Sequence, residues 1–407
     1  MAAALSRTPR RLFLPSRFHS FTYSTTPTPP LQPNSDSPFA SFRAAKSAIL
    51  SQSDPEKLAQ SFIQASKLPA FRRYRPIYHH SIRKLARAQR FDLIDGIIQS
   101  HHKSPSAISE GFWIRLIMLY SSAGMVDQAL HTLDQVILHK PCDLSEKSLS
   151  AVLSVFLDNS MPEKVHEMFR SIPEKISVTP TVVSYNQVSK AFVQQNDLQS
   201  ARNWIDEMYK DDAKVVPNID SYNILLGAHW NNGDLVGFDG IVKEISKRGL
   251  DFNLATYNYR ILRLCKNKEC ARAKKVMDEM VSKGVKPNSG CYDAIIHGYC
   301  NVGDIESAMK ILKSMLEDGY ASPSSRSYYS LIRSMVKEGE FDLALETCRE
   351  IIKRRWVPPF EAMEGLVRGL VDMSRIEEAK EVVEKMKKRL KGPAVDSWGK
   401  IEAALSL

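Results

Sequence analysis

Residues 287–319 read PNSGCYDAIIHGYCNVGDIESAMKILKSMLEDG, and this stretch predicts two helices in tandem. Apolar residues at helical spacing indicate a first helix over residues 291–301 and a second over residues 305–316, with a turn at Gly303-Asp304. Each helix carries one apolar stripe, and an isolated pair cannot bury both stripes. We therefore expect copies of the pair on either side of it.

The same pattern recurs along the chain. One tyrosine position repeats at intervals of 37, 35, 35 and 36 residues, at Tyr185, Tyr222, Tyr257, Tyr292 and Tyr328. A proline keeps this period at Pro180, Pro217, Pro287, Pro323 and Pro358. A small residue keeps it in the second helix, at Ala201, Ala273, Ala308, Ala344 and Ala379. Such an internal period predicts a solenoid of helical hairpins rather than one globular core.

These repeats resemble a known family. The segments SYNQVSKAF from Ser184, SYNILLGAH from Ser221, TYNYRILRLCK from Thr256 and CYDAIIHGYC from Cys291 resemble the first helix of a pentatricopeptide repeat. The 35-residue spacing favours this family over the related tetratricopeptide repeat, whose period is about 34 residues. The resemblance covers roughly residues 75–394. It implies an all-α fold, a right-handed α-solenoid of antiparallel helical hairpins with about nine repeats of 35 residues.

On this basis the chain divides into six parts. Residues 1–35 are a targeting segment and linker, 40–74 an N-terminal capping helical hairpin, 75–181 degenerate repeats, 182–359 well-formed repeats, 360–394 a further degenerate repeat, and 395–407 a C-terminal capping helix. The N-terminal hairpin is expected to have helices over residues 43–51 and 56–66, because Asp54-Pro55 is a typical helix start.

The first 35 residues indicate an organellar destination. They contain no acidic residue, many Ser and Thr residues, and the four arginines Arg7, Arg10, Arg11 and Arg17. This composition is typical of a transit peptide, the alternative being a basic tail without a targeting role. Arginines that interrupt an apolar series favour the mitochondrial matrix over the chloroplast. Removal of these four charges reduces the formal net charge from +10 to +6, which is compatible with a nucleic-acid partner. No apolar stretch long enough for a membrane span is present.

No motif in the chain indicates catalysis. There is no Gly-rich phosphate loop, no His-Glu-x-x-His and no Gly-x-Ser-x-Gly sequence. Some plant pentatricopeptide proteins end in a cytidine-deaminase-like domain with a Pro-Cys-x-x-Cys motif, which Pro141-Cys142 does not complete. The six cysteines share no metal-ligand spacing. The resemblance is therefore to the plain P class, and we expect neither enzyme activity nor a cofactor or metal.

The resemblance also implies which residues meet RNA. In this family single-stranded RNA lies along the first helices and each repeat meets one base, which the fifth and last residues of the repeat select. The corresponding pairs are Asn186 with Asn218, Asn223 with Asn253, Asn258 with Asn288, and Asp293 with Ser324. By the family code, two asparagines favour a pyrimidine, so three successive repeats would prefer three pyrimidines. The alternative is that the asparagines cap helices, which suits Asn218 and Asn288 better than the fifth residues.

The supporting positions of the family are partly kept. At the second repeat position, where an apolar residue wedges between bases, Val183 matches the family, whereas Asp220, Ala255, Gly290, Arg326 and Glu361 differ. At the thirteenth position, near the phosphates, Lys266 and Lys337 match.

Two functions remain open from the sequence. The first is a factor that binds single-stranded organellar RNA and acts in mitochondrial RNA metabolism, through transcript stabilisation, processing or translation. The second is a structural component of the mitochondrial ribosome that contacts rRNA and mitochondrial ribosomal proteins by shape. DNA is not an expected partner of either.

Overall fold

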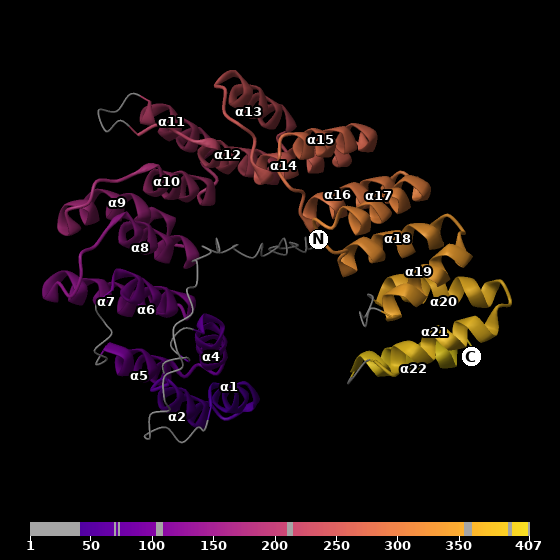
Figure 1. Cartoon of the computed structure of the whole chain (residues 1–407), viewed down its shortest axis with the longest axis horizontal. Helices are drawn as coiled ribbons and strands as arrows, with labels where there is room; N and C mark the ends of the chain where they lie inside the picture. The colour runs from indigo at the N-terminus through magenta and orange to yellow at the C-terminus, as the bar shows by residue number, and fades with distance from the viewer. Residues whose placement is uncertain are drawn as a thin grey trace, which may run out of the picture. The chain divides into compact units, whose positions relative to one another are not determined.

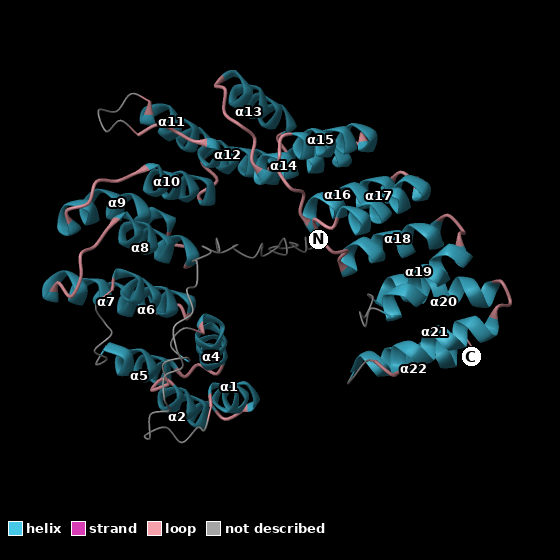
Figure 2. Cartoon of the chain, in the orientation of Figure 1, coloured by secondary structure: helices cyan, strands magenta, loops and turns pink. Residues whose placement is uncertain are grey.

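The structure, a computed structural model, describes residues 41–68, 71, 74–102, 109–209, 215–353, 360–389 and 393–405. These residues form 21 α-helices and, within these ranges, no β-strand (Figures 1 and 2). The all-α class predicted from the sequence is thus confirmed. The predicted transit peptide lies outside the described residues. No helix among the described residues combines the length and the apolar character that a membrane crossing requires.

The first compact unit comprises four helices. They are α1 (Phe42–Ser51), α2 (Pro55–Ala65), α4 (Arg75–Arg87) and α5 (Phe91–His102), of which α5 ends just beyond the unit. The two helices predicted for the N-terminal hairpin are therefore confirmed to within one residue at each end. The Asp54 side chain accepts hydrogen bonds from the backbone N–H groups of Glu56 and Lys57, as expected of a helix N-cap. Buried aromatic rings join the hairpin to the next helices, with Phe62 at 5.0 Å from both Phe71 and Tyr78.

The second unit, His101–Leu407, is a run of helical hairpins. The first helices of the hairpins are α6 (Glu110–Ser122), α8 (Glu146–Asp158), α10 (Val182–Gln194), α12 (Ile219–Asn231), α14 (Leu254–Lys266), α16 (Ser289–Asn301), α18 (Ser325–Lys337) and α20 (Phe360–Asp372). The second helices are α7 (Val126–His139), α9 (Pro162–Ile176), α11 (Leu198–Met208), α13 (Leu235–Lys247), α15 (Cys270–Ser282), α17 (Ile305–Asp318), α19 (Phe341–Lys353) and α21 (Ile376–Lys387). A last helix, α22 (Pro393–Ala404), contacts α21.

The hairpin of α16 and α17 shows why this sequence folds as it does. Asn288 caps α16 by accepting from the N–H of Cys291, and Asp304 caps α17 by accepting from the N–H of Ser307. Between the helices Gly303 has a φ of +79°, a left-handed conformation that glycine adopts without steric cost. Gly319 ends α17 in the same conformation, with a φ of +66°. The turn predicted at Gly303-Asp304 is confirmed.

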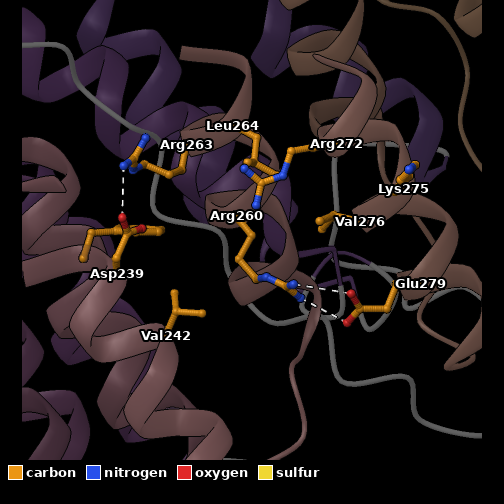
Figure 3. Close-up of a pocket in the computed structure, with 10 residues that line it drawn as sticks. Asp239, Val242, Arg260, Arg263, Leu264, Arg272, Lys275, Val276 and Glu279 are labelled. Atoms are coloured by element: carbon orange, nitrogen blue, oxygen red, sulfur yellow. Dashed lines mark hydrogen bonds and ion pairs between the residues drawn. The ribbon is translucent and has the colours of Figure 1, made fainter. Parts of the chain in front are cut away.

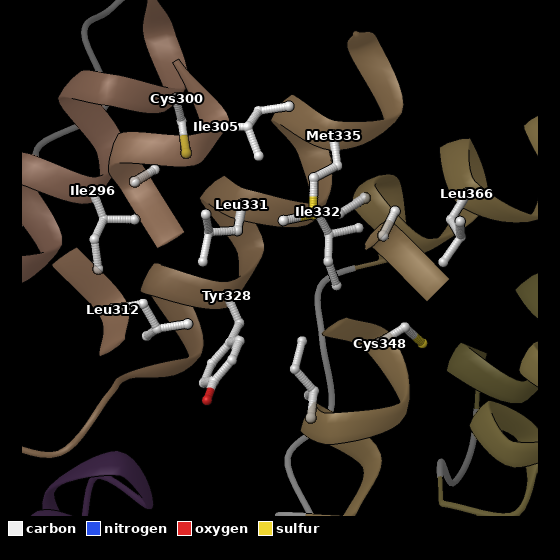
Figure 4. Close-up of a cluster of buried hydrophobic side chains, with 14 of the residues drawn as sticks. Ile296, Cys300, Ile305, Leu312, Tyr328, Leu331, Ile332, Met335, Cys348 and Leu366 are labelled. Carbon is white, nitrogen blue, oxygen red and sulfur yellow. The ribbon is translucent and has the colours of Figure 1, made fainter. Parts of the chain in front are cut away.

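The core follows the repeat period. Within the second unit the periodic tyrosines are buried, as are the periodic alanines of the second helices. Figure 4 shows how Tyr328 and Leu331 of α18 meet Leu312 of α17 and Ile296 of α16. Several tyrosine hydroxyls donate to an acid near the end of the second helix, at 3.0 Å for Tyr257 with Glu279. Burial and this carboxylate raise the pKa of Tyr257 to about 12, so its hydroxyl stays a donor at physiological pH.

One junction departs from the regular stacking. The fourth residue of a second helix is alanine in α7, α11, α15, α17, α19 and α21, but it is Val165 in α9 and Phe238 in α13. A cleft of about 280 Å³ lies between α13, α14 and α15, with Phe238 in its lining (Figure 3). The buried cluster around Tyr222 is separate from the one around Tyr292.

Arginine–carboxylate pairs line this cleft. Arg260 lies 3.1 Å from Glu279, and Arg263 lies 3.0 Å from Asp239. Both guanidinium groups come from α14 and reach opposite second helices, as Figure 3 shows. Polar pairs thus bridge the junction where the apolar core is interrupted.

Candidate nucleic-acid interface

The first helices form one continuous row. Each of α6, α8, α10, α12, α14, α16 and α18 contacts the next first helix along the chain. Every first helix begins with the same repeat positions. The fifth residue of a repeat therefore lies in the first turn of its first helix, next to the N-cap of the first helix in the following repeat. The sequence-predicted pairs lie along this line of helix starts.

The last residue of each of these repeats is a helix N-cap. Asn218 Oδ1 accepts from the N–H groups of Asp220 and Ser221 at 3.0 and 3.1 Å. Asn253 makes the equivalent bonds at the start of α14, Asn288 accepts from one N–H at the start of α16, and Ser324 caps α18. The capping alternative is therefore correct for the last residues. Their side-chain oxygens are occupied by the backbone of their own helix.

The fifth residues contact the cap of the next repeat. Asn186 Nδ2 lies 3.5 Å from Asn218 Oδ1, and Asn223 Nδ2 donates to Asn253 Oδ1 at 3.0 Å. Asp293 accepts from the Ser324 hydroxyl at 2.9 Å. The structure therefore brings the members of these three predicted pairs together. An amide that uses one N–H in this way keeps a second N–H.

The fourth pair, Asn258 with Asn288, differs from the others. Asn258 Oδ1 is buried and has no hydrogen-bond partner. The second residue of the following repeat is Gly290, and a Cβ added to it would lie 3.6 Å from Asn258 Oδ1 and 3.1 Å from Asn288 Oδ1. Both amide oxygens thus lie beside a glycine, which has no side chain to separate them.

The remaining predicted residues surround this line. Val183 is 50% exposed, whereas Asn186 is only 7% exposed. Lys266 is exposed at the end of α14, with its Nζ 5.0 Å from the centre of the Trp230 ring. Lys337 is exposed at the end of α18 and pairs with Glu338 at 3.5 Å. Asp220, at a wedge position, accepts from Asn253 Nδ2 at 3.1 Å, so an acid lies within the line.

Two glutamates at the degenerate repeats were not predicted from the sequence. Glu110 accepts from the backbone N–H and hydroxyl of Ser145, both at 2.7 Å, and from the Ser148 hydroxyl at 2.8 Å. Glu146 accepts from Thr181 Oγ1 at 3.1 Å and from the N–H of Ser184 at 3.0 Å. Both glutamates are the first residue of a repeat and bridge to the next repeat. The sequence contained one signal for them, because both glutamates occupy the first position of a repeat.

These bonds set the charge of the carboxylate. Burial opposes ionisation of Glu110, but the hydrogen bonds from Ser145 and Ser148 leave its pKa below the usual value. It therefore carries a negative charge at neutral pH. In the first two repeats of the second unit, a carboxylate takes the bridging role that the amides of Asn186 and Asn223 have in the next repeats, and the carboxylate of Asp293 has this role in a later one. This part of the row is unsuited to a phosphate backbone.

Among the described residues, no group of three or more His, Cys, Asp or Glu side chains is placed to hold a metal ion. The described thiols are free, and burial raises the pKa of Cys348 and Cys300 to about 12. Such thiols are poor nucleophiles at neutral pH. The chemistry of the row is that of hydrogen bonding and charge.

Comparison with known proteins identifies the repeats. The family described as "Pentatricopeptide repeat domain" matches residues 174–232, 240–296 and 275–338, and "PPR repeat" matches residues 326–355 and 365–389. A mitochondrial pentatricopeptide repeat-containing protein of Arabidopsis thaliana is 30% identical over 90% of this chain and 89% of its own length. Small ribosomal subunit protein mL103 (rPPR7) of Arabidopsis thaliana is 26% identical over 89% of this chain and 87% of its own length.

A solved structure has the same fold. The pentatricopeptide repeat protein PPR10, in complex with an 18-nt psaJ RNA element, matches 90% of this chain with a TM-score of 0.53 and 17% identity. The match spans 60% of the PPR10 chain. The predicted solenoid of helical hairpins is therefore confirmed. From the family matches, the full-length relative and this fold, the chain belongs to the pentatricopeptide repeat family, a non-catalytic family of RNA-binding proteins.

Proposed function

We propose that the chain binds single-stranded RNA along the helix starts of residues 182–324 and acts in mitochondrial RNA metabolism. The observation that carries this proposal is the line of paired side chains at Asn186/Asn218, Asn223/Asn253 and Asp293/Ser324, with Asn258 and Asn288 at the equivalent repeat positions. Unbonded N–H groups of these amides can contact base edges, as single-strand readers of the family do. Three consecutive asparagine pairs favour a run of pyrimidines.

The extent of the RNA contact follows from charge. Glu110 and Glu146 occupy the bridging sites before residue 182 and would repel phosphates. Lys266 and Lys337 are exposed at the ends of two first helices in the later repeats, where they can approach a backbone. We infer a short contact of about four nucleotides, one for each pair.

The proposed compartment rests on two independent observations. The acid-free N-terminus carries four arginines and many hydroxyl residues, which is typical of a transit peptide. A relative that matches nearly the whole chain is a mitochondrial protein by name. The roles open to a non-catalytic binder there are to protect an organellar transcript, to guide its processing or to promote its translation.

A second candidate function is a structural role in the mitochondrial ribosome. It is favoured by the similarity to Small ribosomal subunit protein mL103, which spans 87% of that protein. The wedge positions Asp220 and Glu361 also favour it, because a protein that contacts rRNA by shape has no need of apolar wedges between bases. In this role the solenoid would contact both rRNA and ribosomal proteins.

Two experiments test these functions. In a competition assay with the purified full chain, pyrimidine-rich single strands should displace a labelled probe better than purine-rich strands. A triple variant in which Ala replaces Asn186, Asn223 and Asn258 should lose this preference and keep weak, salt-sensitive binding. A matched control replaces the exposed Asn203, Asn232 and Asn267 and should keep the preference. An unmodified protein without pyrimidine preference would refute base reading.

The second experiment separates the two functions. Mitochondrial extract lysed under conditions that preserve RNA is sedimented through a sucrose gradient, and the protein is followed by antibody. Cofractionation with ribosomal subunits that survives high salt favours the ribosomal role. Sedimentation with small RNA-dependent particles favours the free RNA factor.

A further inference from the structure

The third residue of several repeats is a buried hydroxyl that donates to the fifth residue of the preceding repeat. Ser221 Oγ donates to Asn186 Oδ1 at 2.7 Å, and Thr256 Oγ1 donates to Asn223 Oδ1 at 2.8 Å. Ser327 donates in the same way to Asp293. All three hydroxyl residues are fully buried. The contact is therefore sheltered from competing water.

This hydroxyl fixes which edge of the amide faces outward. Ser221 Oγ also accepts from the backbone N–H of Asn218 at 3.1 Å, so its proton is directed away from that backbone. The nearest acceptor for the proton is Asn186 Oδ1. The amide oxygen is consequently held toward the protein. Only its N–H donors remain for a ligand. Asn223 is held in the same orientation by Thr256.

Asn258 lacks this partner. The third residue of the next repeat is Cys291, whose thiol is a weak donor. Asn258 Oδ1 is left buried without any hydrogen bond. Among the described fifth residues of the repeats in 182–324, this is the only one with a buried side-chain oxygen that lacks a partner. Rotation of the amide about its last side-chain bond therefore breaks no bond to its oxygen. The neighbouring Gly290 carries no side chain to block that rotation.

We propose that the third residue of a repeat is a positioning residue for the base reader of the preceding repeat, and that Cys291 leaves Asn258 able to present either edge. This inference rests on the proposed function. Asn186 and Asn223 offer donors alone, whereas Asn258 offers a donor or an acceptor. Uracil and cytosine carry opposite groups at C4, a carbonyl and an amino group, and also differ at N3. A fixed donor that faces C4 or N3 therefore distinguishes the two pyrimidines, because one base presents an acceptor there and the other a donor, whereas a free amide accepts both.

The test uses oligonucleotides that differ by one exchange at a time, a pyrimidine-to-purine exchange to locate each reader and a uracil-to-cytosine exchange to measure its discrimination. Single Asn223→Ala and Asn258→Ala variants of the full chain first identify the nucleotide that each residue reads. The unmodified protein should discriminate at least fivefold at the nucleotide of Asn223 and less than twofold at that of Asn258. Cys291→Ser supplies the missing hydroxyl and should raise discrimination at the Asn258 nucleotide to about that of its neighbour.

Thr256 provides the reverse change with a matched control. Thr256→Val removes the hydroxyl without changing the shape of the side chain and should abolish discrimination at the Asn223 nucleotide, whereas Thr256→Ser should retain it. Circular dichroism melting verifies that each variant is folded. Should Thr256→Val fail to fold, Cys291→Ser still decides, because it replaces one atom and supplies the hydroxyl that Ser221 and Thr256 have at this position.

The outcomes separate this inference from the function on which it rests. If Asn223→Ala changes base preference but Cys291→Ser and Thr256→Val do not, the positioning role is wrong and base reading stands. If neither asparagine variant alters preference at any nucleotide, both proposals are overturned. A shift confined to the predicted nucleotide in the two hydroxyl variants supports the inference, because a merely structural role would weaken binding to all sequences equally.

Discussion

Replacement of Ala308 by arginine should destabilise the array at its most regular point. Ala308 is the fourth residue of α17 and is 0% exposed, within the buried cluster that includes Ile311 and Leu312. Overpacking of a filled core site typically costs about 1–3 kcal/mol. A buried guanidinium without a partner adds to this, although the long side chain can reach solvent in part. We expect a loss of about 3–4 kcal/mol.

The measurement is urea unfolding of the full chain, followed by circular dichroism at 222 nm. Lys310→Arg serves as the control, since this side chain is exposed on the same helix and should leave the midpoint unchanged. Hydrogen exchange should report the loss first in α16, α17 and α18, because each hairpin of a solenoid depends on its neighbours. An unchanged midpoint for Ala308→Arg would mean that the assigned repeat register is wrong.

Three further predictions concern the N-terminus and two carboxylates. Residues 1–40 fused to a fluorescent reporter should direct it to mitochondria, and a signal confined to plastids or cytosol contradicts the assignment. Hydrogen bonds from Arg349 and Lys385 lower the pKa of Glu381 to about 2. The contribution of Glu381 to stability is therefore present above its unfolded pKa of about 4.5 and is lost as the pH falls toward 2. Glu381→Gln should be less stable than the parent at pH 7, and the difference in urea midpoint should close at lower pH. Glu110→Ala should lower stability by about 1–3 kcal/mol, because three partly buried donors lose their acceptor, and equal melting temperatures would argue against the bridge.

The helices and their core were predictable because they depend on local periodicity. The apolar stripes of residues 291–301 and 305–316 give the helices Ser289–Asn301 and Ile305–Asp318 to within two residues at each end. The alanine position of the second helices identified side chains that are fully buried. Both patterns repeat about every 35 residues, and a pattern that recurs at one period is distinguishable from a chance match in a single segment.

The contacts between neighbouring repeats were not predictable in the same way. The hydroxyl of Ser221 and the amide of Asn186 are 35 residues apart, and only the stacking of α10 on α12 brings them within 2.7 Å. The sequence does contain a hydroxyl at the third repeat position, but Ser and Thr also suit a first helical turn for reasons of capping alone.

The asparagines therefore have a structural role that any test of recognition must take into account. Loss of Asn186 or Asn223 removes the acceptor of a buried hydroxyl, which should cost about 1 kcal/mol of stability in either case. Asn258 accepts no such bond, and its buried oxygen is already without a donor. We therefore expect Asn258→Ala to melt at the temperature of the parent, while Asn186→Ala and Asn223→Ala melt lower. If all three variants destabilise equally in thermal melts, the hydroxyl contacts do not distinguish these repeats, and differences in base preference among them would need another cause.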